Sequence, residues 1–318
     1  MKISLKLAAL FCVALMMFNL SGCGVQRSHN RTVYFAAHDE VKDYTSLLYE
    51  DVKRRCQDMG LQVEYMDAKR DSSLQTEQVN KAVDQGAAAI VLLAVDGTAL
   101  IPAVERANKA GVPVIATNRD LNGGRFAQVM SDEKQAGRLQ GAYMAKHLPQ
   151  GAKVVYLMGQ SSQGVAVQRW EGFMEACLGQ RPDVQLLMMQ DCAWNEADAY
   201  RTMSMWLKIF PQIDGVIAGN DAMALGALRA MKEAGRDQGV LLSGVDGLEP
   251  ALKAVEAGEM AQTVKQDGEK AAEEIAIFIK EALSGRIPTE GVKVPFEEIT
   301  RENLAEYRQA RSAGTGQQ

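Results

Sequence analysis

The sequence predicts an α/β protein with two doubly wound lobes, each a parallel sheet covered by helices on both faces. Short apolar runs alternate with longer amphipathic stretches along most of the chain, which is the pattern of parallel strands and their connecting helices. The strand-loop-helix unit around Asp96 recurs around Asp221, so the two halves resemble each other. A length of 318 residues suits two domains, at roughly 100–200 residues per domain.

Each element follows from its own stretch of sequence. Strands are expected where β-branched and other apolar residues run together, and helices where apolar residues recur every three or four positions. Gly60, Gly86 and Gly111 end the first three helices, and Pro113 stands near a strand start, where proline is tolerated. The predicted strands are 32–37, 61–66, 88–94, 112–117, 154–157, 184–189, 215–218 and 240–245. The predicted helices are 44–59, 74–85, 100–110, 135–147, 165–178, 197–210 and 223–234.

Charge and composition exclude several classes of partner. The chain has 35 basic and 40 acidic residues, a net charge of -5, and no basic block. Nucleic acids and anionic membrane surfaces attract clustered Lys and Arg, so neither is an expected partner. With 47% hydrophobic residues, the chain is apolar enough to form two cores.

The N-terminus has the layout of an export signal. Lys2 and Lys6 precede an apolar run over 7–18, which is shorter than the roughly 20 residues of a membrane-spanning helix. Leu20-Ser21-Gly22-Cys23 resembles the bacterial lipobox, in which the cysteine is lipidated and becomes the first mature residue. We therefore expect a signal peptide over 1–22, a lipid anchor on Cys23 and a linker over 23–31. The alternative is a plain signal peptide with an incidental Cys23.

Three cysteines remain beyond the signal and the anchor: Cys56, Cys177 and Cys192. Cys177 lies near a helix end and Cys192 follows the next strand, so the two sulfurs are expected at opposite ends of the layer, beyond bridging distance. We expect three buried or partly buried thiols. The spacing of cysteines and histidines suggests no metal site.

Polar side chains gather where predicted strands end. In open α/β sheets, ligands bind beyond the carboxyl ends of the strands. Side chains with paired donors or acceptors can span the vicinal hydroxyls of a sugar or polyol, and an aromatic ring can pack on its C–H face. The alternatives are that an Asp or Asn here merely caps a helix, and that a lone Trp belongs to the core. The residues of interest are His38, Lys42, Tyr44, Asp96, Asn118, Arg119, Arg169, Trp194, Asn220, Asp221, Asp246 and Gln266.

Four segments resemble periplasmic sugar-binding proteins of the ribose-binding type, which have the type I periplasmic binding protein fold. They are residues 220–230, residues 244–247, residues 112–119 and residues 169–173. The likeness extends from residue 31 to about residue 300. The same core occurs in sugar-responsive transcription regulators, but those carry an N-terminal helix-turn-helix where this chain has an export signal.

The resemblance implies a set of ligand-binding positions. The family's Asp-Arg pair falls on Asn118-Arg119, so the arginine is retained but the carboxylate becomes an amide. Its remaining positions fall on Arg169, Trp194, Asn220, Asp246 and Gln266. The first loop departs from the family, because His38, Asp39, Lys42 and Tyr44 stand where a Ser or Asn and two aromatics are usual. His38 or Lys42 is therefore expected to set selectivity, ribose itself is in doubt, and an acidic sugar or modified polyol is a further candidate.

We expect two lobes that are joined by three crossovers of the chain and can close on each other. One lobe comprises 32–131 and 267–293, the other 132–266 and 294–310, with a flexible tail over 311–318. The lobes are expected to close on a monosaccharide or polyol. The expected role is the substrate-binding component of an ABC importer, a monomer that meets a transporter permease and touches the membrane through its lipid alone. The alternative is a subunit that presents the ligand to a chemoreceptor or a membrane histidine kinase.

Enzymatic motifs are weak in this sequence. Gly159 and Gly164 stand between a strand and a helix, as in a phosphate loop, but Val165 occupies the position of the lysine. The three histidines are too scattered for a catalytic triad or a zinc site. Asp96 and Asp246 are expected on different lobes. The sequence therefore predicts a binding protein with neither a cofactor nor a metal.

Overall fold

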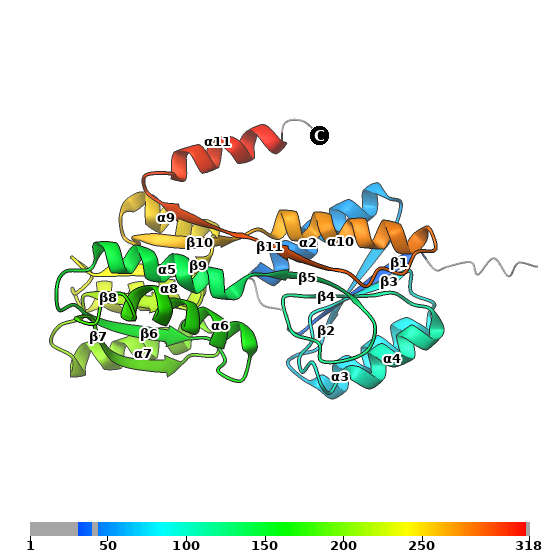
Figure 1. Ribbon diagram of the computed structural model, residues 1–318, viewed down its shortest axis with the longest axis horizontal. Helices are drawn as coiled ribbons and strands as arrows, with labels where there is room; N and C mark the ends of the chain where they lie inside the picture. Colours follow the sequence, from blue (N-terminus) through cyan, green and yellow to red (C-terminus); the bar gives the residue numbers. More distant parts are fainter. Residues whose placement is uncertain (1–30, 40–43, 316–318) are drawn as a thin grey trace, which may run out of the picture. The chain divides into compact units, whose positions relative to one another are not determined.

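The computed structural model describes residues 31–39 and 44–315, with side chains to residue 310. The predicted signal peptide, Cys23 and Lys42 lie outside the described residues. The described chain forms two six-stranded sheets, each with its own helices (Figure 1). No helix in these ranges is both long and apolar enough to cross a bilayer.

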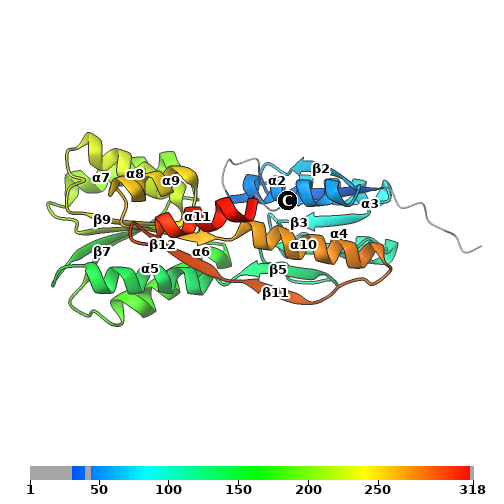
Figure 2. The ribbon, with the colours of Figure 1, turned by 90° about the horizontal axis from the view of Figure 1, so that it is seen from above.

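The first sheet is parallel throughout, in the order β11-β5-β4-β3-β1-β2. The cores on its two faces are formed with α2 and α10 on one side and with α3 and α4 on the other. Although far apart in sequence, α2 and α10 pack against each other (Figures 1 and 2). The strands are Thr32–Ala37 (β1), Gln62–Asp67 (β2), Ala89–Leu92 (β3), Val114–Thr117 (β4), Ala127–Ser131 (β5) and Gly291–Val294 (β11). The helices are Tyr44–Asp58 (α2), Ser72–Asp84 (α3), Ile101–Ala110 (α4) and Gly268–Leu283 (α10).

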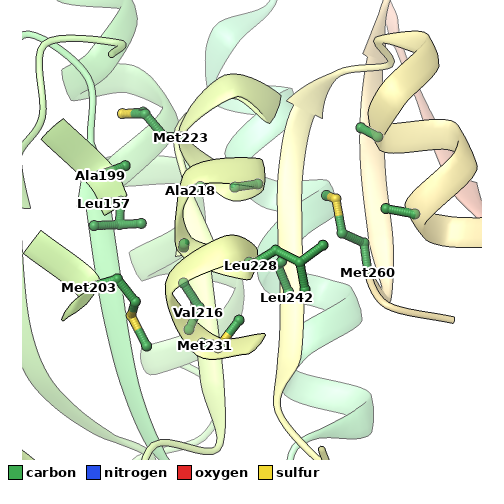
Figure 3. Close-up of a cluster of buried hydrophobic side chains, with 14 of the residues drawn as sticks. Leu157, Ala199, Met203, Val216, Ala218, Met223, Leu228, Met231, Leu242 and Met260 are labelled. Atoms are coloured by element: carbon green, nitrogen blue, oxygen red, sulfur yellow. The ribbon is translucent and has the colours of Figure 1, made fainter. Parts of the chain in front are cut away.

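The second sheet has the order β12-β10-β9-β8-β6-β7, and only its edge strand β12 is antiparallel to its neighbour. One face packs under α7, α8 and α9, where Figure 3 shows Met203, Met223 and Met231 among the buried side chains. The other face packs under α5 and α6. The strands are Lys153–Met158 (β6), Gln185–Asp191 (β7), Gly215–Ala218 (β8), Leu241–Asp246 (β9), Gln262–Gln266 (β10) and Phe296–Thr300 (β12). The helices are Glu133–His147 (α5), Gly164–Phe173 (α6), Glu196–Ile209 (α7), Asp221–Glu233 (α8), Glu249–Ala257 (α9) and Leu304–Thr315 (α11).

The two sheets share one winding, because β2-β1-β3-β4-β5 and β7-β6-β8-β9-β10 have the same order. The chain passes between them after β5, after β10 and after β11. Asp132 and Asp267 occupy equivalent places at the first two crossings, where each caps the helix that follows by accepting a backbone N–H. The predicted fold class, with two doubly wound lobes and three crossovers, is confirmed.

Several local details differ from the sequence prediction. The sequence indicated no strand at 127–131, where a polar Gln128 alternates with apolar residues in a short run. The helix expected over 165–178 is α-helical only to Phe173 and continues as a π-helical turn, Met174–Leu178 (η1). α11 extends to Thr315, into the segment for which a flexible tail was expected. Cys56, Cys177 and Cys192 are buried free thiols, as predicted.

Candidate functional site

One polar pocket receives side chains from both sheets. It is lined by every ligand-binding residue that the sequence predicted, apart from Lys42, which lies outside the described residues. These residues are His38, Tyr44, Asn118, Arg119, Arg169, Trp194, Asn220, Asp246 and Gln266. His38, Asn118, Trp194 and Asn220 follow the carboxyl ends of their strands, and Asp246 ends β9, which is where parallel α/β sheets bind ligands.

Arg169 is the electrostatic centre of the pocket. Its Nε donates to Glu133 Oε2 at 2.7 Å, and its Nη1 donates to the carbonyl of Gly219 at 2.6 Å. Asp246 Oδ1 lies 3.7 Å from the same Nη1. Burial disfavours the charged guanidinium, but Glu133 and Asp246 outweigh it and raise the pKa of Arg169 above its usual value. Arg169 is therefore a fixed cation with its fork held in place.

Glycines set the position of Arg169 on α6. A Cβ at Gly137 of α5 would clash with the carbonyl oxygen of Arg169, and one at Gly172 would clash with the carbonyl oxygen of Lys134. The backbones of α5 and α6 therefore approach closely at this point. This approach brings Glu133, at the start of α5, within reach of the guanidinium.

Trp194 presents its ring to the pocket from the loop after β7. The indole Nε1 donates to Gln163 Oε1 at 2.7 Å, and the Arg169 guanidinium carbon lies 5.5 Å from the ring centroid. A Cβ at Gly159 would overlap the ring. Gly159, which resembled part of a phosphate loop in the sequence, instead provides the space that the indole occupies.

Asn220 has two roles at once. Its side-chain oxygen accepts from the backbone N–H of Met223, which caps α8, and its Nδ2 lies 3.4 Å from the carbonyl oxygen of Trp194. Asn220 therefore caps α8 and also lines the pocket. Asp96 lies outside this pocket: it is exposed, and its carboxylate accepts from the backbone N–H groups of Thr98 and Ala99, which lower its pKa.

Gln266 joins the two lobes at the end of β10. Its Nε2 donates to Asn118 Oδ1 at 3.2 Å and to Ser131 Oγ at 3.1 Å, both in the first lobe. Its Oε1 accepts from Arg169 Nη2 at 3.4 Å in the second lobe. A side chain at a crossover therefore connects the buried cation to the opposite sheet.

Backbone strain is concentrated at the pocket. Asn118 has φ 57°, Trp194 has φ 62° and Asp246 has φ 121°, all in the region that non-glycine residues rarely occupy. Such conformations cost on the order of 1–3 kcal/mol each and persist where the surrounding structure holds them. The fold maintains this strain where it aims side chains into the pocket.

The first loop forms a chain of polar contacts. His38 Nε2 lies 2.8 Å from Asp39 Oδ1, and Arg70 Nε donates to Asp39 Oδ2 at 2.6 Å. Burial alone would raise the pKa of Asp39, but His38 and Arg70 outweigh it and lower that pKa. Tyr44 is buried nearby, and burial together with the charges of Glu133, Asp246 and Asp267 raises the pKa of its phenol.

Sequence reasoning missed several residues of this site. Thr45, Arg70, Gln163 and Val165 also line the pocket, and Glu133 supports it from behind. Gln163 and Glu133 stand at helix starts, a signal that would have placed them near strand ends. Arg70 reaches the pocket through a β2–α3 loop with positive φ, which no sequence pattern indicated.

Asp221 is structural rather than a ligand contact. Its oxygens accept from Thr263 Oγ1 at 2.7 Å and from the backbone N–H of Leu248 at 2.8 Å, which ties α8 to β10 and to the loop after β9. Burial raises the pKa of Asp221 to about 7. Within 31–39 and 44–315, no cluster of three His, Cys, Asp or Glu residues is arranged to hold a metal.

Two similarly wound α/β lobes with a polar pocket between them define a small-molecule-binding protein of the clamshell type. The site offers fixed donors, acceptors and an aromatic ring, which suit hydroxyl groups. Comparison with known proteins agrees with this class. Residues 33–287 match the family model described as periplasmic binding protein domain, and the chain belongs to this family.

Named relatives are binding proteins. The chain is 31% identical over 274 residues to a xylitol-binding protein of Mycolicibacterium smegmatis, covering 84% of this chain and 78% of that protein. It is 32% identical over 223 residues to the ribose import binding protein of Bacillus subtilis, covering 70% and 72%. An ABC transporter solute binding protein from Bacillus halodurans, solved with bound myo-inositol, matches with a TM-score of 0.80 and 27% identity over 87% of this chain and 96% of that one.

Proposed function

We propose that this protein is the extracytoplasmic substrate-binding component of an ABC importer and that it binds a monosaccharide or polyol between its lobes. The observation that carries the proposal is the shared pocket, in which side chains from both sheets offer paired hydrogen-bonding groups and an indole ring. Relatives named for xylitol and for ribose import, and a structural neighbour holding myo-inositol, support the same ligand class.

The residues divide the work of binding by their chemistry. Arg169 and Asp246 provide a fixed cation and a fixed carboxylate that accommodate a hydroxyl as acceptor and donor, respectively. Asn118, Asn220 and Gln266 add amide groups, and the Trp194 ring packs on the C–H face of the ligand. The buried positive charge of Arg169 already has Glu133 and Asp246 as partners. Because no further anion is needed to balance it, the inner pocket favours a neutral ligand.

The crossovers would act as the hinge about which the two lobes close on the ligand. Ligand contacts from both lobes stabilise the form in which the lobes meet, and Gln266 lies at a crossover with hydrogen bonds to both sides. We propose that a transporter permease recognises this closed form. Cys23, in its lipobox-like context, would hold the protein at the membrane by a lipid, and 1–22 would be removed on export.

A thermal-shift screen against pentoses, hexoses, pentitols, inositols and sugar acids tests the ligand class. A ligand at 100 times its Kd adds about 2.7 kcal/mol to the free energy of unfolding, which raises the midpoint by several degrees. The expected result is a shift with at least one neutral sugar or polyol. A shift with none of them, or with sugar acids alone, would contradict the proposal.

A deletion strain tests the transport role. Loss of uptake of the radiolabelled ligand, restored by the native chain and reduced with Cys23→Ala, is expected of a lipid-anchored importer component. Normal uptake combined with loss of a transcriptional or chemotactic response to the ligand would assign the protein to sensing instead.

A further inference from the structure

His38 is a buried side chain in which one polar atom lacks a hydrogen-bond partner within the described residues. The residue is 7% exposed and lines the main pocket as well as an adjoining cavity of about 250 Å³. Its Nε2 lies 2.8 Å from Asp39 Oδ1, but the angle of this contact leaves that oxygen without a hydrogen-bond partner within the described residues. The carbonyl oxygen of His38 accepts from the backbone N–H of Arg70 at 2.8 Å. Its Nδ1 is buried and has no hydrogen-bond partner within the described residues.

The contacts of Asp39 fix which ring nitrogen carries the proton. An ionised carboxylate carries no proton, so an unprotonated Nε2 would bring two lone pairs together at the 2.8 Å that separates it from Asp39 Oδ1. Nε2 is therefore the ring nitrogen that carries the proton. Arg70 Nε holds the other carboxylate oxygen at 2.6 Å, and the Tyr65 hydroxyl donates to the Asp39 carbonyl at 2.7 Å. In the neutral imidazole the remaining nitrogen, Nδ1, is then an acceptor.

A buried acceptor without a partner is costly, and it is retained where something else supplies the donor. Within the pocket, a hydroxyl of a bound ligand is a group that can do so, in place of water. We propose that His38 is a specificity-determining residue whose Nδ1 accepts a hydrogen bond from one ligand hydroxyl, with Asp39 and Arg70 acting as positioning residues that lock the ring in this tautomer. This inference rests on the proposed function and adds the atom and the direction of the hydrogen bond.

The direction of the bond has a chemical consequence. An acceptor requires a proton on the ligand, so a fluorine or a methyl ether at the same position cannot replace the hydroxyl, although either one can still accept. The site would thus select a free hydroxyl at one position of the ring or chain. A site that relied on donors alone, such as Arg169, would tolerate those replacements better.

His147 offers an internal contrast. It is exposed at the end of α5, and its Nδ1 lies 3.0 Å from the carbonyl oxygen of Tyr143, so Nδ1 is the donor there. The two histidines should therefore be opposite tautomers. Because the chain has three histidines, nitrogen-15 NMR of the full-length protein, with His147→Gln and His29→Gln variants for assignment, can read each ring.

The test is a thermodynamic cycle between the ligand and His38. Titration calorimetry compares native protein and His38→Phe with xylitol, ribose and myo-inositol, and then with the monodeoxyfluoro series of whichever of them binds. In native protein, one fluoro derivative should bind on the order of tenfold more weakly than the parent. In His38→Phe that fluoro derivative and its parent should bind with nearly equal affinity, while fluorination at other positions should still weaken binding. His147→Phe should behave as native protein.

The outcomes separate the two hypotheses. A proton on Nδ1 of His38 at neutral pH, whether or not Nε2 is also protonated, would overturn the role of His38 while leaving sugar binding intact. Equal fluoro penalties in native protein and His38→Phe at every position would do the same. If none of the three parents binds, the neutral ligand found by the thermal-shift screen takes their place. The NMR tautomer tests the inference independently of which ligand that is. In Asp39→Ala the proton of His38 should no longer be confined to Nε2, so NMR should find both tautomers. A His38 that stays protonated on Nε2 alone in this variant would refute the positioning role of Asp39.

Discussion

Replacing Arg169 by methionine should destabilise the protein as well as abolish binding. Arg169 is 3% exposed and Glu133 is 1% exposed, and the guanidinium Nε lies 2.7 Å from Glu133 Oε2. Breaking a buried ion pair from one side leaves an uncompensated charge and costs about 3–5 kcal/mol. At roughly 2–4 °C per kcal/mol for a domain of this size, the melting midpoint should fall by about 6–20 °C.

A second variant isolates the cause. In Arg169→Met/Glu133→Gln the nearer of the two carboxylates left by the arginine is gone, while Asp246 remains, so part of the lost stability should return while ligand binding stays absent. Urea denaturation followed by circular dichroism gives the free energies, and calorimetry gives the binding. Equal stability of the single and the double variant would refute the electrostatic reasoning. A free energy of unfolding for Arg169→Met within about 1 kcal/mol of native protein, which is one-fifth to one-third of the expected loss, would refute it too.

Three further predictions follow from single sites. Gly159→Ala should push the Trp194 indole out of place, which should cost about 1–3 kcal/mol of stability and weaken ligand binding. Gly291→Ala is the control and should have neither effect, because the nearest atom to an added Cβ there is 3.9 Å away. Equal ligand affinity in the two variants would argue against the stacking role of Trp194. Burial raises the pKa of Asp221 from 3.8 to about 7, so the native state retains a proton that the unfolded state releases, and stability should fall as pH rises through this window. Urea midpoints at pH 5 and pH 8 measure the fall, and Asp221→Asn should flatten it; the same slope in both proteins would assign it elsewhere. Burial raises the pKa of the Cys56 thiol to about 12 and of Cys177 to about 11, so a thiol reagent at pH 8 should label them only on unfolding, and rapid labelling of native protein would contradict their burial.

The winding of the fold was predictable because inner strands such as β1, β3, β4 and β8 are continuous apolar runs and the helices between them have an apolar face. Both signals are local, and parallel strands joined by helices leave few alternative topologies. β5 was missed because it lies next to the sheet edge and alternates, with polar Gln128 among buried neighbours. The π-helical turn after Phe173 packs against α5, and sequence periodicity records neither this packing nor the change of helical pitch.

The site was predictable to the extent that strand ends converge on one edge of a sheet. His38, Asn118 and Asn220 could be placed by their position after a strand alone. Arg70 could not, because it reaches the pocket through a long-range contact with Asp39. Asp96 and Asp221 show the converse: both follow strands, yet Asp96 closes a turn and Asp221 ties α8 to β10 and to the loop after β9.

A crystal structure with the polyol that gives the largest thermal shift tests the central claim most directly. Density for one ligand molecule is predicted between the lobes, in hydrogen-bonding contact with His38 and Asn118 on one side and with Arg169 and Asp246 on the other. A ligand that contacts one lobe alone, or that binds away from these side chains, would contradict it.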